Sequence, residues 1–199
     1  MSATRDGDGA GTRTRLLRAT LAIVGRDGVG AVTNRAVATE AGVALGSLTY
    51  HFASQQELLQ EALLLFVDEE IARLGEVVAE LAGVESAGDA ESTAARIAAV
   101  FREAGGQAHV AQFELYVQAA RDEELREAVR RCYTAYEEVA RATLVAFGLP
   151  DEDAFVAALV ALIDGYELRR LALGEEPDPP LAELLAGLAE MAAAGAVRA

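Results

Sequence analysis

The sequence predicts an all-α protein. Ala and Leu, which are strong helix formers, are abundant, and apolar residues recur three and four positions apart along most of the chain. The alternation of β-branched or aromatic residues with polar ones that is typical of strands is scarce, and the chain has only four Pro and no Trp. Because 52% of its 199 residues are hydrophobic, the chain can bury the core of one large or two small domains.

The first helix is expected to begin at Thr12 and to end at Gly28. Its apolar stripe comprises Leu16, Leu17, Leu21 and Val24. Residues 1–11 are rich in Gly and Asp and are expected to form a disordered arm. The Gly-x-Gly-x-Gly in this arm is not a phosphate loop, because no strand precedes it and its acidic residues would repel phosphate.

Two short helices are expected next, at about residues 34–40 and 45–51. Thr33 can accept a hydrogen bond from an unpaired amide of the first of them, and Gly42 suits the positive φ of the sharp turn between them. One face of the pair would be buried; it comprises Val37, Ala38, Val43 and Leu48. The opposite face would be polar and able to read DNA as a helix-turn-helix, although two neighbouring helices of an ordinary bundle are the alternative.

The residues of this stretch resemble the amino-terminal DNA-binding domain of the TetR family of transcriptional regulators. The matching positions are Thr33, Val37-Ala38, Ala41-Gly42-Val43, Gly46-Ser47-Leu48, His51-Phe52 and Glu57-Leu58-Leu59. The resemblance implies a three-helix DNA-binding domain over residues 12–54 and a helical ligand-binding and dimerisation domain over residues 55–199. It also implies that a small, largely apolar molecule releases the homodimer, most often a repressor, from a palindromic operator of double-stranded DNA.

The residues expected to contact DNA are Thr33, Arg35, Leu45, Gly46, Ser47, Thr49, Tyr50, His51 and Gln55. The sequence departs from the family pattern at Thr49, where Tyr is usual, at Gln55, where Lys is usual, and at Ala44, where Ser or Thr is usual. Without the Lys, one phosphate contact is missing, which should flatten the salt dependence of binding by roughly one unit. These departures leave open the alternative of a helical protein–protein adaptor that has lost specific DNA binding.

A long helix from Ser54 to about Leu81 is expected to connect the two parts. Ser54 and Glu57 have the spacing of a capping box at its start. In the TetR family, movement of this helix relays ligand binding to the DNA-binding domain. Further helices are expected at residues 90–103, 107–120, 122–147, 151–173 and 180–194.

The last two helices are unusually apolar. Residues 155–163 are apolar nearly all round the helix, and the final helix carries a broad stripe of Leu181, Leu184, Leu185, Leu188 and Met191. This surface is more than a small bundle can cover, so we expect a two-fold dimer whose four-helix interface is formed by helices 151–173 and 180–194. The alternative is that both helices only close the core of the monomer. A dimer would also set two reading helices about one DNA turn, ~34 Å, or somewhat more apart.

An effector site is expected in the middle of the second part. Its candidate residues combine an apolar lining with a few polar groups: Phe101, His109, Gln112, Phe113, Tyr116, Tyr136 and Asp164. Each of them taken singly is also compatible with core packing. Asp164 is a lone charge in an apolar run, so it needs a partner. The partner could be Arg169 or Arg170 of the second subunit, a backbone kink at Gly165, or a cationic ligand.

The net charge of −15 is unevenly distributed. Residues 1–60 hold six Arg and five acidic residues, whereas the remainder holds 11 basic and 27 acidic residues. An acidic second part would repel DNA and leave only the first part able to approach it.

Enzyme motifs are missing from the sequence. Only two His, His51 and His109, are present, and no Glu-x-x-His pair, Gly-x-Ser-x-Gly, phosphate loop or Cys-x-x-Cys is found. We therefore expect no catalytic residues, no cofactor and no metal site. Cys132 has no second Cys to pair with, and no apolar run is long enough to span a bilayer. We expect a cytoplasmic protein without a membrane partner.

Overall fold

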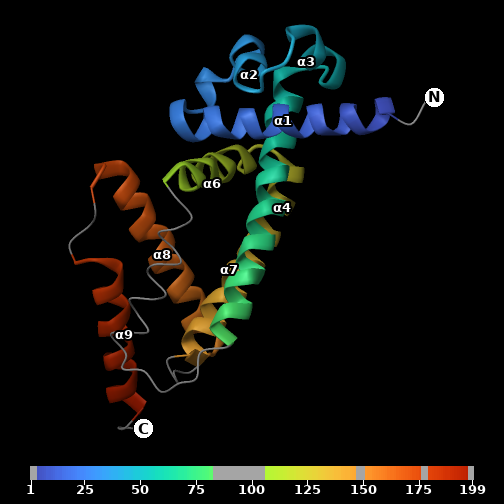
Figure 1. The fold of residues 1–199 in the computed structure, drawn as a ribbon. Coiled ribbons are helices and arrows are strands. Elements are labelled where there is room, and N and C mark those ends of the chain that lie inside the picture. The colour runs from blue at the N-terminus through green and yellow to red at the C-terminus, as the bar shows by residue number, and fades with distance from the viewer. Residues whose placement is uncertain (1–3, 83–105, 147–150, 176–178, 197–199) are drawn as a thin grey trace. The chain divides into compact units, whose positions relative to one another are not determined.

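The computed structural model describes residues 4–82, 106–146, 151–175 and 179–196, and within these ranges all regular structure is helical (Figure 1). The elements are α1 (Thr4–Asp27), the 3-10 helix η1 (Val29–Ala31), α2 (Asn34–Glu40), α3 (Leu45–His51), α4 (Gln55–Ala82), α6 (Gly106–Ala119), α7 (Glu123–Ala146), α8 (Asp153–Leu173) and α9 (Leu181–Ala196). The all-α prediction is confirmed. No helix among the described residues has the length and apolar character needed to cross a membrane.

The expected helices correspond closely to the observed ones. The bounds of α2 and α3 are those predicted, and the bounds of α4, α6, α7, α8 and α9 lie within two residues of the prediction. The helix expected at residues 90–103 lies outside the described residues. The first helix differs, because α1 begins at Thr4 instead of Thr12. Once a helix is nucleated, each added residue gains a hydrogen bond, so a strong helix can continue into a stretch of weak helix formers.

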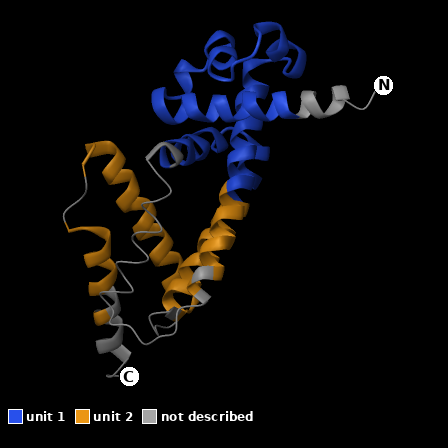
Figure 2. Ribbon diagram, in the orientation of Figure 1, with its two compact units in different colours: residues 1–69, 106–130 blue, residues 70–105, 131–199 orange. Residues whose placement is uncertain are grey.

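The chain divides into two compact units (Figure 2). Unit 1 comprises residues 1–69 and 106–130, and unit 2 comprises residues 70–105 and 131–199. Helices α4 and α7 each contribute residues to both units. The expected functional boundary at residues 54–55 does not coincide with this division by packing and stays a prediction.

Unit 1 is built around α1. Helices α2, α3 and α6 all pack against α1, and in Figure 1 the pair α2–α3 lies on one side of α1 and α6 on the other. In the predicted apolar stripe of α1, Leu16, Leu17 and Val24 are buried and Leu21 is partly buried. Ile23, which was not assigned to the stripe, is buried as well. Other fully buried side chains of the unit are Val37, Leu48, Leu58, Leu63 and Leu115. This core fixes α2 and α3 on α1 through their apolar faces and leaves the opposite faces to solvent.

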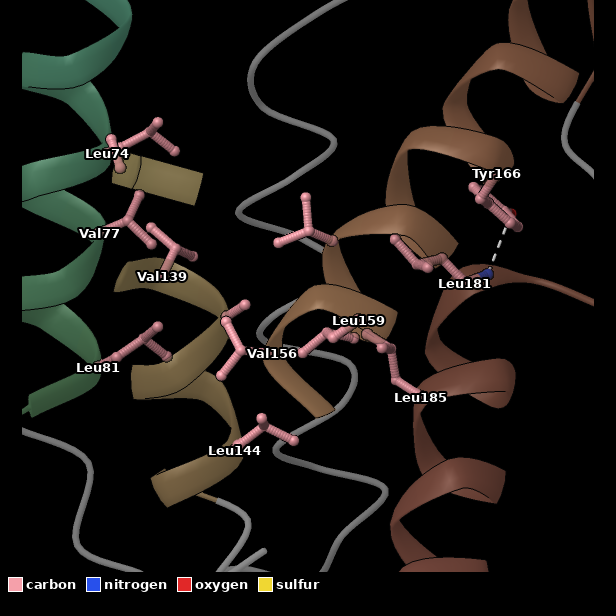
Figure 3. Packing of buried hydrophobic residues seen from close by; sticks show 13 residues of the cluster. Leu74, Val77, Leu81, Val139, Leu144, Val156, Leu159, Tyr166, Leu181 and Leu185 are labelled. Atoms are coloured by element: carbon pink, nitrogen blue, oxygen red, sulfur yellow. Dashed lines mark hydrogen bonds between the residues drawn. The ribbon is translucent and has the colours of Figure 1, made fainter. Parts of the chain in front are cut away.

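Unit 2 holds a second apolar core, to which α4, α7, α8 and α9 all contribute (Figure 3). Its members include Leu74, Val77, Leu81, Val139, Leu144, Val156, Leu159, Leu181 and Leu185. At the edge of this core, the backbone N–H of Leu181 donates a hydrogen bond of 3.0 Å to the buried hydroxyl of Tyr166. The hydroxyl thereby satisfies one of the amides that the first turn of α9 leaves without a helical partner. Helix α8 ends at Leu173 and is capped by Gly174, whose φ of 70° is the left-handed conformation that glycine adopts readily.

Candidate nucleic-acid interface and effector site

The connection between α2 and α3 has the backbone geometry of a tight helix-turn-helix. The side chain of Thr33 accepts a hydrogen bond of 3.2 Å from the N–H of Ala36, which confirms it as the cap of α2. Gly42 has a φ of 65°, as the turn requires. The backbone N–H groups of Gly42 and Val43 donate to the carbonyls of Thr39 and Ala38 at 3.1 and 3.0 Å. The turn therefore satisfies the carbonyls at the end of α2 while reversing the chain into α3.

Helix α3 is anchored by its buried face. Leu48 is buried in the middle of α3, and Phe52, which ends the helix, is buried after it. Ala44 is the N-cap of α3 and forms no side-chain hydrogen bond, because its side chain is a methyl group without an acceptor atom. The short helix α3 thus depends on tertiary packing instead of on a side-chain cap.

At the start of α4, the predicted capping contact is present, since the N–H of Glu57 donates to Ser54 Oγ at 3.0 Å.

The outer face of α2 and α3 carries the residues expected to contact DNA. Thr33, Arg35, Leu45, Gly46, Thr49, Tyr50 and Gln55 are exposed, whereas Ser47 and His51 are partly buried. The side chain of Tyr50 is 85% exposed, and its ring stands edge-on to that of His51 with centroids 5.1 Å apart. The Thr49 hydroxyl donates to the Gly46 carbonyl at 3.1 Å. The structure brings these residues together on one unit, and whether they touch DNA stays a prediction.

Gln55 has an additional contact that the sequence did not reveal. Its side-chain amide donates a hydrogen bond to the backbone carbonyl of Val32. Val32 lies between η1 and α2. The Gln55 side chain therefore connects the start of α4 to the entry of the helix pair.

Three arginines of α1 are paired with carboxylates of unit 1, whereas Arg15 donates to the Thr12 hydroxyl at 3.1 Å. Arg13 forms an ion pair with Glu61 and lies over the Phe52 ring at 5.3 Å. Arg18 pairs with Glu69 at 2.7 Å. Arg26 donates to two acidic groups, and its hydrogen bonds to Asp27 and then to Glu40 raise the pKa of its guanidinium above the usual value. Arg35, by contrast, is exposed on α2.

The effector candidates of unit 1 lie together on α6. His109 and Gln112 are buried, and the Gln112 side-chain amide donates to the Tyr116 hydroxyl at 2.8 Å. The rings of Phe113 and Tyr116 meet edge-on with centroids 5.8 Å apart. This group combines polar atoms with aromatic surface, and Gln112 and Tyr116 are hydrogen-bonded to each other. Effector binding by these residues stays a prediction.

Tyr136 and Asp164, the effector candidates of unit 2, each bind a group that was not predicted. The Tyr136 hydroxyl donates to the buried carboxylate of Glu70 at 3.3 Å, and the Tyr133 hydroxyl donates to Asp164 at 2.9 Å. The rings of Tyr133 and Tyr136 meet edge-on with centroids 6.2 Å apart. Arg73 also binds Glu70 at 2.7 Å, and this hydrogen bond raises the pKa of Arg73 above its usual value.

These contacts revise what the sequence indicated about the site. Asp164 has a partner in its own chain, Tyr133, that none of the three expected alternatives included. Glu70 was missed, although an acidic residue between Val67 and Leu74 of an apolar helical stripe was a detectable signal. The α6 candidates and the candidates of unit 2 belong to different compact units. Phe101 lies outside the described residues.

Comparison with known proteins gives the family. The family model described as "Bacterial regulatory proteins, tetR family" matches residues 16–62, and that described as "Tetracyclin repressor-like, C-terminal domain" matches residues 88–193. The HTH-type nicotine-responsive transcriptional repressor HdnoR of Paenarthrobacter nicotinovorans is 25% identical over 173 residues, which cover 83% of this chain and 86% of HdnoR. The two family models describe domains of transcription regulators, and this relative is a transcriptional repressor.

Two solved structures are similar over most of their length. A transcriptional regulator from Rhodococcus sp. Rha1 is 26% identical, with a TM-score of 0.68 and coverage of 92% of this chain and 96% of that chain. The multidrug binding protein EbrR, solved in complex with proflavin, is 27% identical, with a TM-score of 0.62 and coverage of 90% and 98%. The carboxy-terminal family model alone covers more than half of the residues of this chain, and the amino-terminal model covers the helix-turn-helix. The chain therefore belongs to the TetR family of transcriptional regulators.

Proposed function

We propose that this protein is a homodimeric, ligand-responsive repressor of the cytoplasm. The free dimer holds a palindromic operator, and a small, largely apolar molecule releases it by favouring the conformation that does not bind. The observation that carries the proposal is the α2–α3 pair, in which Leu48 is buried against unit 1 while Arg35 and Tyr50 are exposed on the opposite face. The similarity to the repressor HdnoR favours this function over a protein–protein adaptor.

The surface of α8 supports the dimer. One set of its exposed residues recurs three and four positions apart and consists only of apolar residues and glycine: Ala154, Ala158, Ala161, Gly165, Leu168 and Ala172. Asp153 and Arg169 are exposed outside this set. A Cβ placed on Gly165 would meet nothing within 4 Å, so a second helix could approach closely there. Phe155 and Leu173 add large exposed apolar side chains to the ends of α8. Such a continuous apolar face is best covered by a second copy, with α8 and α9 of both subunits forming a four-helix interface.

The effector proposal draws on the chemistry of the candidate residues and of the relatives' ligands. Aromatic rings with a few polar groups line small-molecule sites in general, and His109, Phe113 and Tyr116 of α6 provide such groups. HdnoR is described as nicotine-responsive, and EbrR was solved with proflavin. Nicotine and proflavin are both small ring compounds composed mainly of carbon. The same class of molecule is the first to screen, by loss of operator binding on its addition.

Operator binding tests the proposal directly. A palindromic duplex selected from random DNA, or taken from next to the protein's own gene, is titrated with the wild type and with Arg35→Ala and Tyr50→Ala. Both variants should bind more weakly while keeping the wild-type melting temperature, because both side chains are exposed. Arg121→Ala, which removes an exposed Arg outside the helix pair, is the matched control and should bind normally. Wild-type affinity in both variants would refute the interface, and the absence of any specific, salt-sensitive complex would refute the function.

A further inference from the structure

The base-reading chemistry of α3 is unusual for a helix that enters the major groove. Bidentate hydrogen bonds to guanine come from Arg or Lys, and those to adenine come from Asn or Gln. Helix α3 has the sequence LGSLTYH and contains none of these four residue types. Arg35 and Asn34 lie on α2, the helix that crosses the DNA backbone in this motif. Direct readout by α3 must therefore depend on other groups.

Leu45 is the exposed apolar group at the position that reads bases. It is the first residue of α3, and the first residues of a recognition helix are the ones that reach base edges. Its side chain is 48% exposed, although the buried face of α3 is formed by Leu48. Thr49 lies one turn further on. Its hydroxyl donates its hydrogen to the Gly46 carbonyl, and its methyl group is available for apolar contact. Leu45 and Thr49 thus form a small apolar strip along α3.

We infer that this strip reads thymine through its 5-methyl group. The inference rests on the proposed function, since it assumes that α3 enters the major groove. The thymine methyl is the one apolar group that the standard bases present in that groove, and apolar side chains recognise it by contact. Burying Leu45 against it removes from water the apolar surface that unit 1 leaves exposed. Tyr50, which is 85% exposed, carries a hydroxyl at its tip and is assigned to phosphate.

Uracil substitution tests the inference, because uracil pairs as thymine does but lacks the methyl group. An operator is first selected from random duplexes at fixed salt. Each thymine is then replaced by uracil symmetrically in both half-sites, and dissociation constants are measured by fluorescence anisotropy. At one thymine position the wild type should lose about fourfold in affinity per half-site, the fold-change that corresponds to ~0.8 kcal/mol for one buried methyl-sized group. Leu45→Ala should bind the thymine and uracil duplexes equally at that position.

The outcomes separate the inference from the proposed function. Equal affinity of the wild type for all thymine and uracil duplexes would overturn the inference alone, as would discrimination that persists unchanged in Leu45→Ala. Failure to select any sequence would overturn the proposed function and the inference with it. Thr49→Ser provides a second variant, because it keeps the hydroxyl bond to Gly46 and deletes only a methyl group. It should reduce discrimination at a neighbouring thymine and leave the position read by Leu45 unchanged.

Discussion

Leu168 offers a quantitative test of the proposed dimer. The residue lies in the exposed apolar strip of α8, and 52% of its surface is accessible in the single chain. Full burial of a Leu side chain contributes ~1.5–3 kcal/mol, so covering the accessible half contributes about 1 kcal/mol. In a two-fold interface the residue occurs twice, and Leu168→Ala should therefore cost about 2 kcal/mol of association free energy. This change corresponds to a dimer dissociation constant raised about 30-fold.

Sedimentation velocity over a range of protein concentrations measures that constant. Val117→Ala is the matched control, because Val117 is 55% exposed but lies on α6 in unit 1. It should leave the dimer dissociation constant unchanged. The melting temperature of Leu168→Ala should be compared at concentrations where both proteins are dimeric, since oligomerisation itself stabilises the fold. An unchanged constant for Leu168→Ala, or an equal increase for both variants, would show that the strip on α8 is not the interface.

Three further substitutions probe features of the two units. Ala44→Ser should cap α3 and stabilise the protein by about 1 kcal/mol, which a melting temperature raised by ~2–4 °C would report; no rise would mean that the N-cap does not limit stability. Gln55→Lys should steepen the logarithmic dependence of operator binding on salt by about 0.9, and an unchanged slope would place the side chain away from phosphate. Tyr166→Phe leaves the buried N–H of Leu181 without its acceptor and should cost ~1–3 kcal/mol in urea unfolding, whereas an unshifted midpoint would mean that another group satisfies this amide.

The parts of the fold that depend on local chemistry were predictable from the sequence. The cap at Thr33 and the turn at Gly42 are determined by residues within a few positions of each other. The capping contact of Ser54 with Glu57 is equally local. The start of α1 was less predictable. In a Gly-rich stretch, the low helix propensity of the residues opposes the hydrogen bond gained as the helix is extended, and the two free energies differ only slightly.

The pairing of polar groups in unit 2 was beyond sequence reasoning. Tyr133 and Asp164 are 31 positions apart, and Tyr136 and Glu70 are 66 positions apart. Helical periodicity assigns each of these residues to a face of its own helix, but it carries no information on which faces meet or at which height. Similarly, the Gln55 contact with the Val32 carbonyl depends on where α4 begins relative to the connection between η1 and α2. The family could therefore be assigned from local motifs, whereas the partners of individual side chains required the structure.

The paired arginines of α1 have a consequence for how the protein would find its operator. Arg13, Arg18 and Arg26 already form ion pairs with carboxylates of the same unit, so they add less than unpaired arginines to the attraction between unit 1 and an arbitrary stretch of DNA. Sequence-independent sites outnumber an operator by roughly a million-fold or more in a genome. A regulator with weak sequence-independent affinity spends less time occupied by those competing sites. Fewer copies of the protein per cell would then suffice to keep one operator occupied. Expression of the controlled gene would change quickly once these few copies leave the operator.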